Sequence, residues 1–245
     1  MTRTRVKVCC IASLDEARIA IRAGASALGL VSEMPSGPGV ISDDRIAEIA
    51  AAAPPGVATF LLTCLTDPDE IAEHQRRSGV GVIQLCDEPA AGARTALKRA
   101  LPGVKIVQVI HVRGAESVAA ARAAAREADA LLLDSGRPDL AVKELGGTGR
   151  THDWETSRAI REAVDVPVYL AGGLRVGNVA RAIAIVRPFG VDLCSGIRSA
   201  GRLDERLLAE FMRAVAEQDA AVAGGPGVDR PSPVRAGTPR SERYD

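Results

Sequence analysis

Val191-Asp192-Leu193-Cys194-Ser195-Gly196 is a short apolar strand that ends in Ser-Gly, and the earlier strand Val168-Tyr169-Leu170-Ala171 ends in Gly172-Gly173. Small residues at a strand end leave backbone N–H groups open to a ligand, and glycine lets an anion come close. In an eight-stranded α/β barrel, the loops after strands 7 and 8 are where a phosphate usually binds. We therefore expect a barrel with a phosphate site at these two turns, formed by Gly172, Gly173, Ser195 and Gly196. The alternative is that both are ordinary tight turns from strand to helix.

Apolar segments of strand type recur at even intervals along the chain, with helical patterns between them. The expected strands are Val6–Ile11, Ala27–Val31, Ala58–Thr63, Gly81–Leu85, Val104–Val112, Ala130–Asp134, Val166–Ala171 and Val191–Ser195. Their continuous apolar character is typical of parallel strands covered by helices. Eight such strand–helix units predict a (β/α)8 TIM barrel, and a doubly wound open sheet is the competing arrangement.

Two expected helices carry start signals, and the end of the chain carries none. Ser13 and Glu16 form a capping-box pattern, in which the serine accepts from the third helical N–H and the glutamate returns a bond. Asp67-Pro68 places a capping carboxylate before a proline at the first helical position. Residues 217–245 contain Gly-Gly-Pro-Gly and scattered charges without apolar periodicity. We expect one barrel over residues 5–216, followed by a disordered tail.

The composition argues against several kinds of partner. Lys+Arg and Asp+Glu both count 31 in 245 residues, so no net field would attract nucleic acid or an anionic membrane. Only 2% of the residues are aromatic, which disfavours broad stacking surfaces. The N-terminus has no apolar signal segment, and no apolar run approaches the roughly 20 residues that span a bilayer. The five cysteines have neither disulfide nor zinc-ligand spacing. We expect a soluble, cytoplasmic protein without a metal.

Asp134 follows three leucines, Leu131–Leu133, so its carboxyl group is expected at the mouth of an apolar barrel. Loss of hydration there would raise its pKa, which suits a general acid near neutral pH. The alternative is a carboxylate that only accepts backbone hydrogen bonds in the following turn.

Cys9 and Cys10 end the first strand and are candidates for a base or nucleophile, a role that requires the thiolate. Lys7 lies two residues before Cys9, on the same face of the strand, where its charge would favour that thiolate. Strand alternation points Cys10 to the opposite face. The alternative is that both cysteines are inert packing residues.

Gly146-Gly147-Thr148-Gly149 lies in a long loop, and long loops in compact domains are usually functional. This segment is a candidate lid over a ligand, with a solvated connection as the alternative. His111, within an apolar strand, and His152, near a helix start, are expected to be structural.

Taken together, these segments resemble the phosphoribosylanthranilate isomerase family from about Val6 to Val215. The most specific segment is Gly146–Trp154. The other segments that carry the resemblance are Lys7–Ile11, Gln84-Leu85, Ala130–Asp134, Ala171–Leu174, Asn178-Val179 and Arg187–Gly196.

The resemblance implies an Amadori rearrangement in tryptophan biosynthesis, which turns an N-ribosylanthranilate phosphate into a 1-deoxyribulose phosphate. Asp134 matches the acid that protonates the ring oxygen and opens the furanose to a Schiff base. Cys9 matches the base that removes the C2′ proton. The phosphate of this sugar substrate would lie on the two turns quoted first, and Gly147, Thr148 and Gly149 would form a substrate loop. The resemblance implies no metal or organic cofactor, and it is compatible with a monomer or a homodimer.

The chain departs from the family where the anthranilate carboxylate is gripped. The family usually has an Arg in a Ser-Pro-Arg-Tyr segment after strand 2, whereas Pro35–Val40 carries no cation. His111 stands where an Arg is common, and Cys10 where a Gly is usual. Arg113, just beyond strand 5, is a candidate contact for the carboxylate. Two alternatives therefore stay open: an isomerase of another phosphosugar, and a non-catalytic barrel that binds a phosphometabolite.

Overall fold

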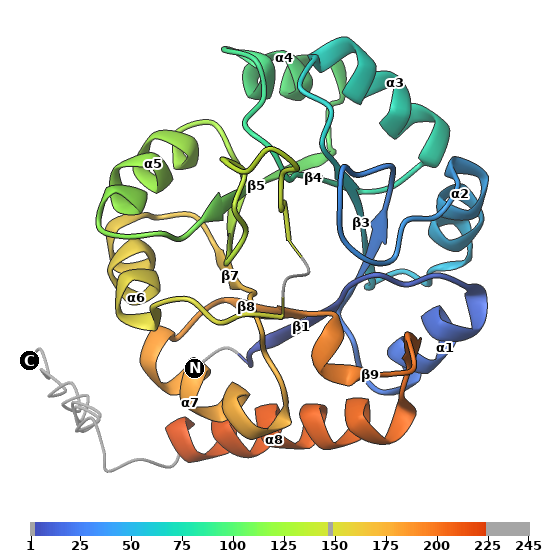
Figure 1. The fold of residues 1–245 in the computed structure, drawn as a ribbon. Coiled ribbons are helices and arrows are strands. Elements are labelled where there is room, and N and C mark those ends of the chain that lie inside the picture. The colour runs from blue at the N-terminus through green and yellow to red at the C-terminus, as the bar shows by residue number, and fades with distance from the viewer. Residues whose placement is uncertain (1–2, 147–148, 224–245) are drawn as a thin grey trace, which may run out of the picture.

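The computed structural model describes residues 3–146 and 149–223 as a closed barrel of eight parallel strands, β1 to β8 in chain order. Figure 1 looks into this barrel and shows the helices as a ring around it. The strands are β1 (Arg5–Val8), β2 (Ala27–Val31), β3 (Ala58–Thr63), β4 (Val82–Leu85), β5 (Lys105–His111), β6 (Ala130–Asp134), β7 (Val168–Leu170) and β8 (Gly190–Leu193). The predicted (β/α)8 TIM barrel is confirmed.

One helix follows each strand of the barrel, as this fold requires. The helices are α1 (Leu14–Arg22), α2 (Asp43–Ala52), α3 (Pro68–Ser78), α4 (Ala93–Ala100), α5 (Glu116–Ala125), α6 (Trp154–Ala163), α7 (Val176–Val186) and α8 (Glu205–Ala223). A 3-10 turn, η1 (Ser195–Ile197), and a small hairpin of β9 (Arg198–Ser199) and β10 (Arg202–Leu203) connect β8 to α8. The sequence patterns did not predict this hairpin.

Strand β1 is shorter than expected, and the difference has a local cause. We predicted a strand over Val6–Ile11, but β1 ends at Val8 because the chain turns at Cys10, whose φ is +61°. That left-handed conformation is incompatible with a continuing strand. By contrast, β2, β3 and β6 have the predicted bounds.

The core has two layers, one between strands and helices and one inside the barrel. Val6 and Val8 of β1 belong to the outer layer, together with apolar residues of α7 and α8. Lys7, between them, points inward and is fully buried, with its ammonium 5.2 Å from the centre of the Phe60 ring. Because side chains alternate along a strand, Lys7 and Cys9 share the interior side, as predicted.

The predicted helix caps are present, with one change of partner. Ser13 accepts from the Glu16 N–H at 3.2 Å, and Asp67 accepts from two N–H groups of the first turn of α3. Glu16 returns its bond to the N–H of Ala12 at 3.0 Å, not to that of Ser13. Its other oxygen accepts from Arg198 and from the Leu203 N–H in the hairpin after β8. The Glu16 carboxylate therefore makes contacts that a simple capping box does not have.

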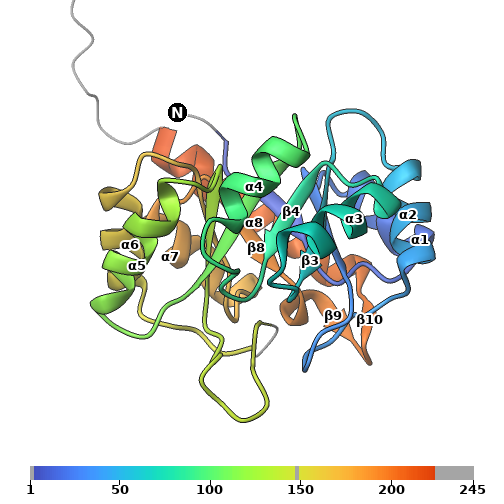
Figure 2. The same ribbon diagram turned by 90° about the horizontal axis from the view of Figure 1, so that it is seen from above.

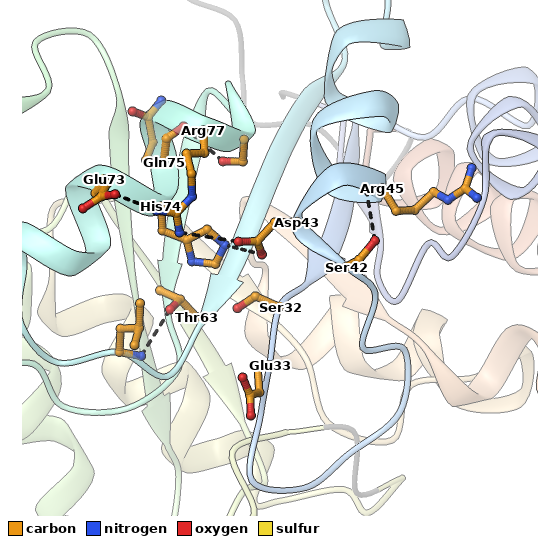
Figure 3. Close-up of polar contacts among 12 residues, drawn as sticks. Ser32, Glu33, Ser42, Asp43, Arg45, Thr63, Glu73, His74, Gln75 and Arg77 are labelled. Atoms are coloured by element: carbon orange, nitrogen blue, oxygen red, sulfur yellow. Dashed lines mark hydrogen bonds and ion pairs between the residues drawn. The ribbon is translucent and has the colours of Figure 1, made fainter.

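Helices α2 and α3 are joined by a polar contact outside the barrel mouth. His74 is 5% exposed, and its Nε2 lies 2.9 Å from the Asp43 carboxylate at the start of α2 (Figure 3). Arg77 approaches the same carboxylate at 3.5 Å. The contact fixes two neighbouring helices of the outer ring, and we assign it a structural role.

Helix α8 extends to Ala223, so residues 217–223 are helical and do not begin a disordered tail as we expected. Asp219 explains the longer helix, because its carboxylate accepts from the N–H and the hydroxyl of Thr4 at 2.8 and 2.6 Å. The rest of the expected tail, residues 224–245, lies outside the described residues. Among residues 3–146 and 149–223, we find no helix with the length and apolar character that crossing a membrane requires.

Candidate active site

A cavity opens at the carboxyl ends of the barrel strands, the end where this fold carries its active sites. Figure 2 shows this end of the barrel, with the long loop between β6 and α6 and the β9–β10 hairpin, opposite the N-terminus. The predicted site residues that line the cavity are Cys9, Asp134, Gly149, Gly172, Gly173 and Ser195. Residues at opposite ends of the sequence therefore meet in one cavity.

Asp134, the last residue of β6, is 8% exposed inside this cavity. Burial raises the pKa of its carboxyl group, which is the direction predicted for a general acid. Its Oδ1 also accepts from the Ser135 N–H at 2.7 Å, so the backbone bond offered as the alternative is present too. A Cβ on Gly146 would lie 2.9 Å from the other oxygen, so glycine there leaves room beside the acid.

Cys9 lies above a buried ion pair inside the barrel. The ammonium of Lys7 is 2.9 Å from the carboxylate of Asp192, its register neighbour on β8. Burial by itself would lower the pKa of Lys7, but Asp192 and the nearby Cys9 thiol raise it above its ordinary value, so Lys7 is a cation. A Cβ on Gly29 would meet Cys9 Sγ at 2.8 Å and Lys7 Nζ at 3.0 Å, which shows that the thiol and the cation are close neighbours.

Cys10 also lines the cavity, and our expectation that it points to the opposite face is wrong. Alternation fails because the strand ends before Cys10 and the backbone there is left-handed. Hydrogen bonding to the Cys194 thiol, together with burial, raises the pKa of Cys10. Its side chain packs against Gly39, where an added Cβ would lie only 2.4 Å from the Cys10 Cβ.

Arg198 of β9 holds this turn from the side, a role that the sequence patterns did not reveal. Its guanidinium donates to the Cys9 carbonyl at 3.4 Å and to the Cys10 carbonyl. It also pairs with both oxygens of Glu16, at 3.0 and 3.1 Å, and that carboxylate accepts from the Leu203 N–H. Burial opposes the charge on Glu16, but Arg198 and the backbone donors lower its pKa, so the pair is ionised.

The two predicted phosphate turns lie next to each other at the cavity wall. Gly172 and Gly173 have φ of +81° and +60°, a left-handed region that favours glycine. A Cβ on Gly173 would approach the carbonyl oxygen of Gly149 at 2.7 Å, so glycine also permits the β6–α6 loop to pack there. Gly196 does not line the cavity; an added Cβ would lie 2.0 Å from the Leu174 carbonyl oxygen, so it serves the packing of η1.

The other candidates lie around the rim. Arg113 does not line the cavity; its guanidinium is 3.5 Å from Asp139 and about half exposed. His152 packs near Gly172, with Nε2 2.7 Å from Ser157 Oγ, and burial lowers the pKa of its imidazole to about 4. The substrate-loop residues Gly147 and Thr148 lie outside the described residues.

Within the described part of the chain, no three His, Cys, Asp or Glu side chains are placed to hold a metal ion. The fold and the cavity thus define a (β/α)8 barrel in which a buried carboxyl group, a thiol near a lysine and the turns after β7 and β8 line one cavity. Residues 6–214 match the family model for N-(5′-phosphoribosyl)anthranilate (PRA) isomerase. The chain belongs to this family.

Individual relatives agree with this assignment. The chain is 36% identical to an N-(5′-phosphoribosyl)anthranilate isomerase of Methanocella arvoryzae, over 86% of this chain and 98% of that protein. It is 39% identical to the protein of that name from Haloferax volcanii, over 81% and 86% of the two chains. The crystal structure of phosphoribosyl anthranilate isomerase from Thermotoga maritima superposes with a TM-score of 0.75 at 26% identity, covering 87% of this chain and 99% of that one.

Proposed function

We propose that this protein isomerises N-(5′-phosphoribosyl)anthranilate to the corresponding 1-deoxyribulose phosphate, the Amadori step of tryptophan biosynthesis. The observation that supports this most directly is one cavity lined by Asp134, Cys9 and the turns at Gly172-Gly173 and Ser195, in a member of the PRA isomerase family. In this reading the protein is a cytoplasmic enzyme, a monomer or a homodimer, that acts on a phosphorylated sugar without a metal or organic cofactor.

Asp134 is the proposed acid. Burial raises its pKa and so favours the protonated carboxyl group, which would deliver its proton to the furanose ring oxygen. The C1′–O bond then breaks as the amine nitrogen supplies its lone pair, and the product is an open-chain protonated Schiff base. The Ser135 N–H, 2.7 Å from Oδ1, stabilises the carboxylate that is left behind.

Cys9 is the proposed base. Its thiolate takes the proton from C2′, the C–H electron pair forms the C1′–C2′ double bond, and the iminium becomes an enolamine. The thiol lies close to the ammonium of Lys7, which is paired with Asp192 inside the barrel. Return of a proton to C1′ and loss of the enol proton complete the ketone, so atoms and charge balance over the reaction.

The phosphate would be held by backbone donors. The donors would be the N–H groups of Gly172, Gly173 and Ser195, which line the cavity, and α7 has no acidic residue in its first turn. A turn at a helix N-terminus favours an anion. Ser195→Asp is the clean test, since Gly173 cannot accept a side chain in this backbone. If inorganic phosphate no longer competes with the substrate in the folded variant, the phosphate site is supported. Unchanged competition between phosphate and substrate would contradict this site.

The activity itself is tested by the decrease in fluorescence of the anthranilate substrate. Asp134→Asn and Cys9→Ala should each lower kcat by about a hundredfold or more, since general acid–base groups contribute at least that much. Cys64→Ala is the matched control, because Cys64 lies outside the cavity. No turnover by the folded wild-type protein would reject the proposal, whereas phosphate binding without turnover would favour the non-catalytic alternative.

A further inference from the structure

The cavity has a wall that the phosphate and the two proton-transfer groups do not use. In the barrel order, β3 and β4 lie across the axis from β7 and β8, as Figure 1 shows. A substrate whose phosphate lies on the β7 and β8 turns, and whose reacting carbons lie between Cys9 and Asp134, points its amine substituent at the opposite side. We call this side the aglycone wall; it consists of Met34, Pro38, Leu62, Gln84, Cys86 and Leu145.

The aglycone wall carries no positive charge. The charged residues that line the described part of the cavity are two carboxylates, Asp134 and Asp192, and the second is neutralised by Lys7 underneath it. Gly147 and Thr148, which lie outside the described residues, are uncharged types. An anthranilate carboxylate that enters this wall would therefore lose hydration without gaining an ion pair.

The four cations of the β5–α5 and β6–α6 loops are each paired with a carboxylate in the described structure. Lys143 pairs with Asp87, and Arg113 pairs with Asp139. Moving either to the cavity would break an existing pair. Position 39, in the loop after β2, cannot supply a side chain either, because a Cβ on Gly39 would overlap Cys10.

Gln84 is the polar group that the aglycone wall does present. It is 4% exposed, and its Oε1 is buried without a hydrogen-bond partner in the described structure, while Nε2 faces the Cys86 sulfur at 3.7 Å. A buried acceptor without a partner is unfavourable, and a donor from a ligand would relieve it. An ionised carboxylate has no donor, whereas a carboxamide has two.

From these observations, which rest on the proposed isomerase function, we infer that the enzyme does not select for the aglycone carboxylate. Its substrates are N-(5-phosphoribosyl)arylamines as a class, including rings with no substituent, and rings with an uncharged hydrogen-bond donor are preferred through Gln84. In a site with a cation, the charge-assisted bond would give the carboxylate an advantage of about ten- to a hundredfold.

The test compares three substrates with the wild-type protein: the adducts of ribose 5-phosphate with 2-aminobenzoate, aniline and 2-aminobenzamide, each followed by chromatography of the ketose product. We expect kcat/KM for the aniline adduct to be within about threefold of that for the 2-aminobenzoate adduct, and the highest value for the carboxamide. A tenfold or greater preference for the carboxylate would overturn the inference and leave the isomerase function intact. No turnover of any adduct would instead reject the isomerase function itself.

Two pairs of proteins separate the effect of the wall from the intrinsic reactivity of the adducts. Met34→Lys places a cation in the wall on a side chain of similar length, and Met34→Gln is its uncharged control. The preference for carboxylate over aniline should rise at least tenfold in Met34→Lys relative to Met34→Gln. Gln84→Met should remove the preference for the carboxamide over aniline that the wild type shows. An equal preference in the wild type and Gln84→Met would refute the assignment of Gln84.

Discussion

Acidification should destabilise this protein through His152, and the size of the effect follows from its burial. Burial lowers the pKa of His152 from 6.5 to about 4, because the imidazolium would lose hydration at its half-buried position in the β6–α6 loop. The unfolded chain therefore binds this proton first as the pH falls. The stability that the neutral imidazole contributes is present above pH 6.5 and is lost progressively between pH 6.5 and 4. Each unit of pKa corresponds to about 1.4 kcal/mol, so the loss is about 3 kcal/mol.

Urea unfolding at pH 7 and pH 4 measures this loss when wild type is compared with His152→Gln, which cannot titrate. The wild type should lose about 3 kcal/mol more than the variant between the two pH values. Ser157→Ala is the control: it removes the hydroxyl 2.7 Å from Nε2 and should lower stability at both pH values by about 1 kcal/mol, without removing the pH dependence. Identical pH dependence of wild type and His152→Gln would refute the reasoning.

Three further predictions concern the charged groups of the barrel mouth. Asp134→Asn should remove activity and raise the melting temperature at pH 7. A carboxyl group with a raised pKa contributes stability when it is protonated, and this contribution is lost as the pH rises through its folded pKa. A lower melting temperature of the variant would contradict this prediction. Asp192→Asn should destabilise the protein by about 3–5 kcal/mol in urea titrations, since it leaves the Lys7 cation buried without a partner. Adding Lys7→Met should recover most of this stability. No recovery would show that loss of the ion pair is not the cause. Arg198→Met should lower kcat by about ten- to a hundredfold with a smaller change in KM, because it releases the Cys9-Cys10 turn. The exposed control Arg206→Met should leave kcat unchanged. An effect on KM alone would argue against a positioning role for Arg198.

Local sequence patterns were sufficient for much of the fold. The strands at β2, β3 and β6 were predicted to the residue because each is a short, predominantly apolar segment between helical patterns. Asp134 could be recognised for the same reason, since three leucines determine where its carboxyl group lies. Helix caps at Ser13 and Asp67 depend only on residues three positions apart.

The errors arose where distant segments determine a local structure. Cys10 departs from strand alternation because Arg198, far along the chain, holds its carbonyl and Gly39 makes room for its side chain. The reach of α8 to Ala223 depends on the contact between Asp219 and Thr4. Arg113 was proposed from its position after β5, but its pairing with Asp139 cannot be inferred from spacing.

The pairing of β1 with β8 has a consequence for how the chain is made. Lys7 is translated 185 residues before Asp192, the carboxylate that permits its burial. Until then the first strand cannot settle into an apolar interior without an unpaired charge. A nascent chain that stops before β8 should thus remain open at this seam, with its apolar strands available to chaperones or to other chains. The order of synthesis thus assigns the closing of this barrel to its last strand, which brings the partner of the buried lysine.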